Sequence, residues 1–168
     1  GPDHPYTALV VFALGEVAAA TERFGDAADL FARVVTIRAQ RFGPGHSSVA
    51  SALTRAGIAY RALGRTEEAE GTLEAALRIW RRAQYPIAEE LRLALENAVA
   101  LYEGQGRRDE AIALEREVVA LTLREVGEGD LAYAAEIEAL AVLLRAAGQA
   151  SEAADLEARA AAIRAGGG

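Results

Sequence analysis

The chain has 168 residues, which is long enough for one domain or one repeat array with a buried core. Hydrophobic residues make up 52% of it, but many are alanine and only 6% are aromatic, which favours closely packed helices over a sheet sandwich. The formal net charge is −7, and arginine supplies all 18 positive charges. This acidity argues against nucleic acid and against an anionic membrane surface as partners.

Several residue types and patterns are missing from the chain. Without cysteine there can be no disulfide, no thiolate zinc site and no cysteine nucleophile. No apolar run reaches the roughly 18 residues that cross a bilayer, and no signal-peptide pattern is visible. Because there is also no methionine, we expect a processed product or an excised fragment of a longer protein.

A short motif recurs along the chain at intervals of 42 residues. It reads GRTEEA at 64–69, GRRDEA at 106–111, GQASEA at 148–153 and, as a weaker copy, ERFGDA at 22–27. The last residue of each copy is an alanine: Ala27, Ala69, Ala111 and Ala153. A period of this length without gaps predicts a repeat architecture.

Each repeat contains two stretches with apolar residues at helical spacing. We expect the eight helices, in chain order, at 5–21, 25–41, 47–63, 66–83, 88–104, 108–125, 131–147 and 150–164.

The recurring motif predicts the end of one helix and the start of the next. Gly64 can adopt the left-handed conformation that closes a helix. Thr66 can cap the following helix, and Glu67 and Glu68 then lie in its first turn, where acids favour the helix dipole. This interpretation outweighs a catalytic pair of carboxylates. Ala69 and its counterparts are expected where two helices cross closely.

The pattern resembles that of the tetratricopeptide repeat family, in which a large apolar residue is followed by Leu, Gly, Tyr, Ala and Phe at fixed spacing. The matching residues are Val11, Leu14, Gly15, Ala18, Ala27 and Phe31 in the first unit, and Leu53, Ala56, Gly57, Tyr60, Ala69 and Leu73 in the second. The 42-residue period is similar to the kinesin light chain subtype, which is common in bacteria. The resemblance implies an all-α fold, a right-handed α-α superhelix (solenoid) of four helix-turn-helix repeats.

Three positions, Glu22, Glu115 and Glu157, depart from the family pattern. Glu22 stands where glycine is expected, so that turn is less well specified. Glu115 and Glu157 replace a large apolar residue, so we expect looser packing in the last two repeats. The subtype often carries asparagines that bind peptide backbone, and only Asn97 matches them.

The resemblance implies that the first helix of each pair lines a concave groove that takes a peptide or partner protein. Residues four and seven apart share a helix face. The expected groove residues are Phe12, Glu16, Thr54, Arg55, Ile58, Arg61, Glu96, Asn97, Ala100, Glu103, Glu138, Val142 and Arg145.

We expect a single array over residues 1–168, with repeats at 4–45, 46–87, 88–129 and 130–165. Val10 and Val17 should then lie on an apolar N-terminal edge that a preceding helix would cover. We expect this edge to be covered by an upstream repeat or by self-association.

Other candidate sites are less favoured. His4 and His46 could suggest a metal pair, but they lie at equivalent joints one repeat apart. Ser47 and Ser48 beside His46 could suggest a nucleophile and base, but no orienting acid or oxyanion site is evident, so helix capping is preferred. We therefore expect no catalytic residue, no metal and no cofactor.

The sequence favours a cytoplasmic protein–protein interaction module that works by binding alone. The alternative is a regulatory or sensor arm of a larger bacterial signalling ATPase or enzyme whose catalytic domain lies elsewhere. Arginine without lysine, with abundant alanine and glycine, also suggests a GC-rich bacterial source.

Overall fold

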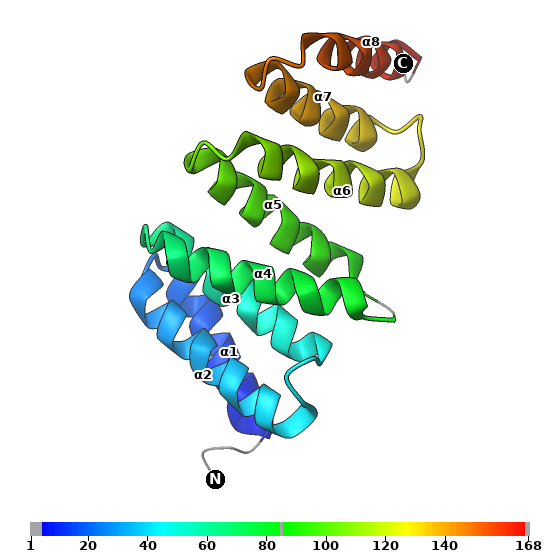
Figure 1. The fold of residues 1–168 in the computed structure, drawn as a ribbon. Coiled ribbons are helices and arrows are strands. Elements are labelled where there is room, and N and C mark those ends of the chain that lie inside the picture. Colours follow the sequence, from blue (N-terminus) through cyan, green and yellow to red (C-terminus); the bar gives the residue numbers. More distant parts are fainter. Residues whose placement is uncertain (1–4, 85, 167–168) are drawn as a thin grey trace. The chain divides into compact units, whose positions relative to one another are not determined.

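The computed structural model describes residues 5–84 and 86–166, and Figure 1 shows these residues as helices joined by short turns, with no strand among them. The helices are α1 (Pro5–Ala20), α2 (Phe24–Phe42), α3 (Ser47–Ala62), α4 (Thr66–Arg82), α5 (Ala88–Gly104), α6 (Arg108–Val126), α7 (Leu131–Ala146) and α8 (Ala150–Gly166). All eight expected helices are therefore confirmed. The largest difference is at the last one, which continues to Gly166 instead of ending at residue 164.

The helices form two compact units, residues 1–97 and residues 98–168. In the first unit α1 packs on α2, α2 on α3 and α3 on α4; in the second, α6 packs on α7 and α7 on α8. Each of these helices thus packs against a neighbour in sequence, as helical repeats do.

The turn inside each helix pair has the same backbone conformation in every repeat. Its central residue has a positive φ: 58° at Glu22, 70° at Gly64, 73° at Gly106 and 81° at Gly148. At Gly64 the next amide, that of Arg65, donates to the Tyr60 carbonyl over 2.9 Å, and the Gly64 amide donates to the Arg61 carbonyl over 3.0 Å. This is the Schellman pattern, which satisfies the last carbonyls of a helix.

Of the residues after this turn, the two acids lie where the sequence predicts, but Thr66 does not. Glu67 and Glu68 lie in the first turn of α4 and are exposed. Glu68 accepts a hydrogen bond from Arg65 over 2.6 Å, and this bond lowers the pKa of the Glu68 carboxyl. Thr66 does not cap α4; the cap position is Arg65, which makes no side-chain cap bond.

At two of the junctions between repeats, a side chain caps the N-terminus of the next helix. His46 Nδ1 accepts from the Ser48 amide at the start of α3 over 3.1 Å and also contacts Ser48 Oγ. Asp130 performs the same function for α7, accepting from the Ala132 amide over 2.7 Å. His46 and Ser48 therefore serve helix capping, with the histidine itself as the cap.

Close helix crossings lie at the predicted small residues. The four recurring alanines, Ala27, Ala69, Ala111 and Ala153, have no accessible surface. A Cβ atom placed on Gly57 in α3 would lie 2.6 Å from Leu73 Cγ in α4. In the second unit Val99 and Ala141 occupy the positions of this glycine, and Glu115 and Glu157 those of the leucine. The buried Glu115 is 5% exposed.

Candidate functional site

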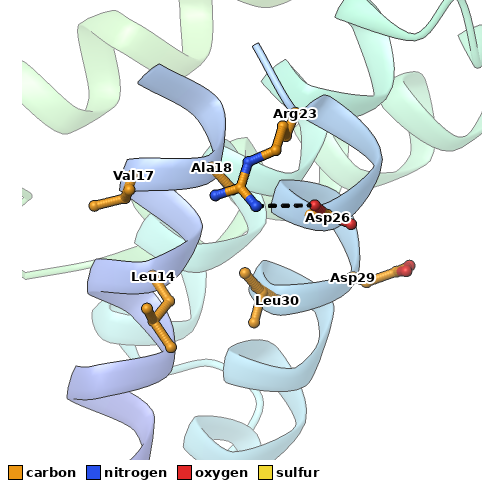
Figure 2. A pocket seen from close by; sticks show the side chains of 7 residues that line it. All are labelled: Leu14, Val17, Ala18, Arg23, Asp26, Asp29 and Leu30. Atoms are coloured by element: carbon orange, nitrogen blue, oxygen red, sulfur yellow. Dashed lines mark hydrogen bonds and ion pairs between the residues drawn. The ribbon is translucent and has the colours of Figure 1, made fainter. Parts of the chain in front are cut away.

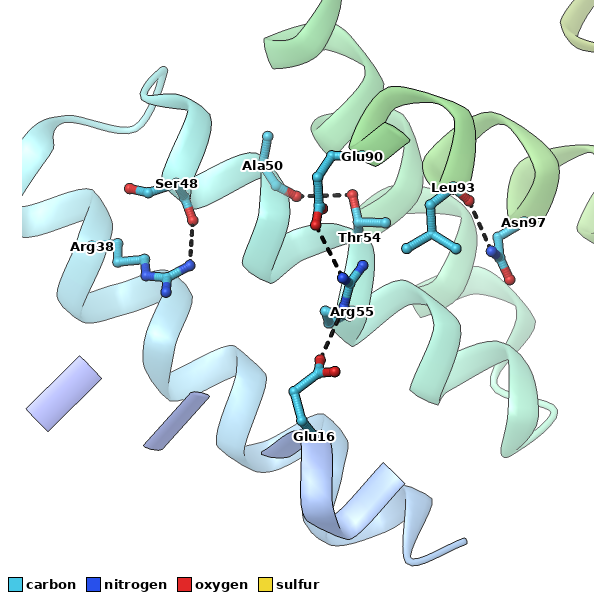
Figure 3. Close-up of polar contacts among 9 residues, drawn as sticks. All are labelled: Glu16, Arg38, Ser48, Ala50, Thr54, Arg55, Glu90, Leu93 and Asn97. Atoms are coloured by element: carbon cyan, nitrogen blue, oxygen red, sulfur yellow. Dashed lines mark hydrogen bonds and ion pairs between the residues drawn. The ribbon is translucent and has the colours of Figure 1, made fainter. Parts of the chain in front are cut away.

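Three successive first helices are joined by one arginine in the unit of residues 1–97. Arg55 in α3 donates through Nε to Glu16 in α1 over 2.9 Å and through Nη2 to Glu90 in α5 over 3.0 Å (Figure 3). The Arg55 and Glu90 side chains are only 22% and 21% exposed. Arg55 Nη1 and Glu90 Oε2 are buried and have no hydrogen-bond partner among the described residues. The cluster therefore retains one unused donor and one unused acceptor.

A second contact joins α3 to α5. Arg61 Nη2 donates to Asn97 Oδ1 over 3.0 Å, and Asn97 Nδ2 donates to the Leu93 carbonyl over 2.8 Å. The amide that the family resemblance assigns to peptide binding is thus engaged within the protein. A partner would have to share or replace these bonds.

Phe12 and Thr54 contribute differently from what the sequence suggests. Phe12 packs edge-on against Phe31 at 5.4 Å, and the Arg38 guanidinium lies 4.6 Å from its ring centre. Arg38 also donates to the Ser48 carbonyl over 2.7 Å; its burial lowers the pKa of the guanidinium, and the nearby Glu90 opposes that shift. Thr54 is fully buried.

The buried Thr54 hydroxyl donates to the Ala50 carbonyl one turn earlier over 2.9 Å (Figure 3). In this conformation it cannot contact a partner. Helical spacing alone assigned Thr54 to the groove because Thr54 is next to Arg55 in the sequence and lies at the edge of the groove face.

A pocket of about 350 Å³ lies beside the arginine cluster. Its lining combines three carboxylates with two guanidinium groups and one apolar side chain: Glu89, Glu90, Glu96, Arg55, Arg92 and Leu93. Ile58, half-buried, is one helical turn from Arg55 on α3. The expected groove residues Glu16, Arg55 and Glu96 therefore lie at or next to a hollow in this unit.

The expected groove residues of the second unit include further ion pairs. Glu138 in α7 pairs with Arg164 in α8 over 2.6 Å, which lowers the pKa of the Glu138 carboxyl. Arg145 in α7 pairs with Glu157 in α8 over 2.6 Å, which raises the pKa of the Arg145 guanidinium. Val142 between them on α7 is 67% exposed. Ala100 and Glu103 in α5 are also exposed.

A different pocket of about 370 Å³ lies between α1 and α2. Figure 2 shows Leu14 and Val17 on α1, Leu30 on α2, and the Arg23–Asp26 ion pair of 3.5 Å among the lining residues. The α1 residues belong to an exposed apolar face: Tyr6, Leu9, Val10, Leu14 and Val17 are between 52% and 73% exposed. The exposure expected for Val10 and Val17 is confirmed.

Sequence reasoning missed the partners of the groove charges. Glu90, Glu157 and Arg164 lie on helix faces that the 42-residue period does not assign to the groove, and Arg38 lies on a second helix. The available signal was charge complementarity for Glu16, Arg55, Glu138 and Arg145, whereas the partner of Arg61 is the neutral Asn97.

No group of three or more potential metal ligands is found among the described residues. His4 lies outside those residues, so the expectation that it forms no metal pair with His46 stays a prediction. Within the part of the chain that the structure describes, no helix combines the length and apolar character needed to span a membrane.

Comparison with solved structures places the fold among helical-repeat proteins. The chain resembles a kinesin light chain protein with nearly identical TPR-like repeats from Podosopora anserina, with 25% identity and a TM-score of 0.81 over 98% of this chain and 78% of that one. BtubC (BKLC) from P. vanneervenii has 22% identity and a TM-score of 0.79 over 95% of this chain and 63% of that one. MamA protein has 14% identity and a TM-score of 0.53 over 95% and 93% of the two chains.

The sequence comparisons agree with these structural similarities. No curated protein sequence matches the chain. The family described as Tetratricopeptide repeat matches residues 7–82 and again residues 92–131, which together are more than half of the chain. The expected all-α repeat fold is thereby confirmed, and the chain belongs to the tetratricopeptide repeat family of protein-interaction scaffolds, with kinesin light chain-like proteins among its structural neighbours.

Proposed function

We propose that the first-helix face of residues 1–97, defined by Glu16, Arg55, Ile58, Arg61 and Asn97, binds an extended segment of a partner protein. The observation that carries this proposal is the Arg55 cluster, in which one guanidinium joins α1, α3 and α5 beside a pocket of about 350 Å³. Arg55 Nη1 and Glu90 Oε2 are buried, so a peptide backbone pairs with them only when the two side chains move.

The ion pairs of this face do not prevent binding. Glu16 is 46% exposed in its pair with Arg55, and pairs of this kind contribute only about 0–1 kcal/mol because water competes for the charges. A carboxylate or carbonyl of the partner can therefore replace Glu16 at Arg55 with little loss. Acidic side chains of the partner that do not pair with Arg55 or Arg92 would be repelled by Glu89, Glu90 and Glu96, which gives the face selectivity.

The second unit supplies a face of its own in this proposal. The exposed Val142 lies between the charge pairs of Glu138 and Arg145, and Ala100 and Glu103 are exposed in α5. An apolar side chain flanked by opposite charges suits contact with an amphipathic segment. The function that this arrangement supports is binding without catalysis, in the cytoplasm and without nucleic acid, which the net charge of −7 disfavours as a ligand.

Selection from random peptides displayed on phage tests the first-helix face. Peptides enriched on the wild type are expected to bind Arg55→Ala and Ile58→Asp at least about ten-fold more weakly, a change of roughly 1.4 kcal/mol. Arg33→Ala is the control, because Arg33 is exposed on α2 and is not part of this face. Enriched peptides that bind all three variants like the wild type would refute the proposal.

The exposed face of α1 supports self-association as a second mode of binding. The residues one repeat after Val10, Leu14 and Val17 are Ala52, Ala56 and Ala59, and all three are buried in the first unit. The same helix face is thus a packing surface in α3 and is uncovered in α1. Sedimentation should show concentration-dependent association that Val10→Glu with Val17→Glu abolishes; a wild type that is monomeric at every concentration would contradict it.

The alternative role as an arm of a larger signalling ATPase is not favoured. The matching family and the similar structures are described as repeat proteins, and their descriptions name no ATPase.

A further inference from the structure

A third pocket, of about 430 Å³, lies among α2, α3 and α4, away from the first-helix face. Leu53 lines this pocket, whereas Arg55 lines the first-helix face. Two residues apart in an α-helix, their side chains point roughly 200° apart around the axis. The pocket and the first-helix face are therefore separate surfaces of the same unit.

The walls of this pocket are apolar and only half-buried. Val35 and Ala39 contribute from α2, Leu53 from α3, and Ala75 and Ile79 from α4. Exposed apolar surface in a concave site lowers the free energy of a complex when a partner's apolar side chain fills it, by about 25 cal/mol for each Å² removed from water. No carboxylate lines the pocket among the residues described.

Two arginines stand at the pocket without counter-charges. Arg78 and Arg82 are exposed, and the described part of the chain provides neither with an ion-pair partner. Elsewhere in this unit Arg55 and Arg65 are paired with glutamates. Arg78 and Arg82 thus add two positive charges to the edge of an apolar pocket that no carboxylate lines among the described residues.

The spacing of the two guanidinium groups restricts what can pair with both. Arg78 and Arg82 are four residues apart in α4, so they lie on one face about 6 Å apart along the axis. Carboxylates at alternate positions of an extended chain are separated by a similar distance, roughly 6.6 Å. Arginine binds each carboxylate through two parallel hydrogen bonds, which fixes its orientation.

We propose that this pocket, lined by Val35, Leu53, Ile79, Arg78 and Arg82, is a second binding site for an acidic–apolar segment of a partner protein. The apolar side chain of that segment enters the pocket, and acidic residues at alternate positions pair with the two arginines. The proposal rests on the protein's role in binding other proteins, but it does not depend on the first-helix face.

The test compares random peptides selected on the wild type with those selected on Arg78→Glu/Arg82→Glu. The wild type is expected to enrich a class with two acids at alternate positions next to a large apolar residue, and the charge-reversed variant should not enrich it. A synthetic, fluorescein-labelled peptide of that class should bind the variant at least about ten-fold more weakly by fluorescence anisotropy. Added salt should weaken its binding to the wild type.

Two further variants separate charge from shape. Arg33→Glu/Arg124→Glu changes the net charge equally at exposed positions outside the pocket and should bind the labelled peptide like the wild type. Ala75→Phe fills the pocket without changing charge and should weaken binding. Helix content and thermal unfolding of each variant establish that it is folded.

The two proposed sites give distinguishable outcomes. Peptides of the acidic–apolar class should bind Arg55→Ala and Ile58→Asp as tightly as the wild type. They should therefore still be enriched if the first-helix face binds nothing. The inference is overturned if the wild type enriches no acidic–apolar class. It is also overturned if such peptides bind Arg78→Glu/Arg82→Glu as tightly as the wild type.

Discussion

Replacing Glu22 with glycine tests the repeated turn at its one irregular position. Glu22 has a φ of 58°, whereas the residues at the same place in the other three repeats are glycines with φ between 70° and 81°. The amides of Glu22 and Arg23 donate to the carbonyls of Ala19 and Ala18 over 3.0 and 2.8 Å, as the equivalent amides do in the other turns. The substitution therefore changes conformational preference while the hydrogen bonds stay the same.

The expected effect follows from two opposing terms. A residue with a Cβ atom is destabilised in the left-handed region by about 1–2 kcal/mol. Replacing Glu22 with glycine removes this cost, but glycine makes the unfolded chain more flexible, which lowers the free energy of unfolding by roughly 0.5–1 kcal/mol. Glu22→Gly should thus raise the free energy of unfolding by about 0.5–1 kcal/mol, which corresponds to an increase in Tm of about 1–4 °C for a chain of this length.

The single tryptophan offers a local measurement of this change. Trp80 is fully buried in α4, in the same unit as Glu22, so its fluorescence reports the unfolding of that unit in urea. Gly64→Glu is the reciprocal control, since a Cβ atom on Gly64 meets no heavy atom within 4 Å and only its φ of 70° opposes the change. It should lower stability by a similar amount. If Glu22→Gly lowered the urea midpoint, or if Gly64→Glu left it unchanged, the reasoning from backbone strain would be refuted.

Two other perturbations have equally direct readouts. Gly57→Ala should lower the free energy of unfolding by about 1–3 kcal/mol, because its Cβ would lie 2.6 Å from Leu73 Cγ. Gly71→Ala in α4 is the control: its Cβ meets nothing within 4 Å, so it should raise the free energy of unfolding by up to about 1 kcal/mol. Equal effects of the two variants in urea unfolding would contradict the packing argument. Glu138 has its pKa lowered by Arg164, so its stabilisation is present above the ordinary glutamate pKa of about 4.3 and is lost as the pH falls through the lowered value. Thermal unfolding at several acidic pH values should therefore show a smaller loss of stability for Glu138→Gln than for the wild type, and parallel curves would exclude this contribution.

The helices were predictable because local signals and the repeat period agree. Glycine at 64, 106 and 148 requires no tertiary information to indicate a helix end, and the alanine that recurs every 42 residues marked the close crossing at Ala69. Where the local signal was wrong, as with Thr66 as a cap, the chain satisfied the turn through backbone hydrogen bonds instead.

The candidate site was less predictable because its properties depend on side-chain partners. The helical period places Arg55 on the first-helix face, but it cannot show that Glu90, 35 residues later, shares this guanidinium with Glu16. Nor can it show that Thr54 points inward. The pocket at Arg78 and Arg82 was missed for a related reason: an unpaired charge is recognised only when every neighbouring side chain has been placed.

The pairing of charges divides the unit of residues 1–97 into two kinds of binding surface. On the first-helix face the arginines at 55 and 61 already have partners, so binding there exchanges one polar contact for another and derives its free energy mainly from apolar contact. Arg78 and Arg82 have no ion-pair partner to be displaced among the described residues, so a carboxylate adds attraction that salt weakens. The first surface should therefore select partners by shape and hydrogen bonding, and the second should attract acidic segments from a distance and depend more strongly on ionic strength.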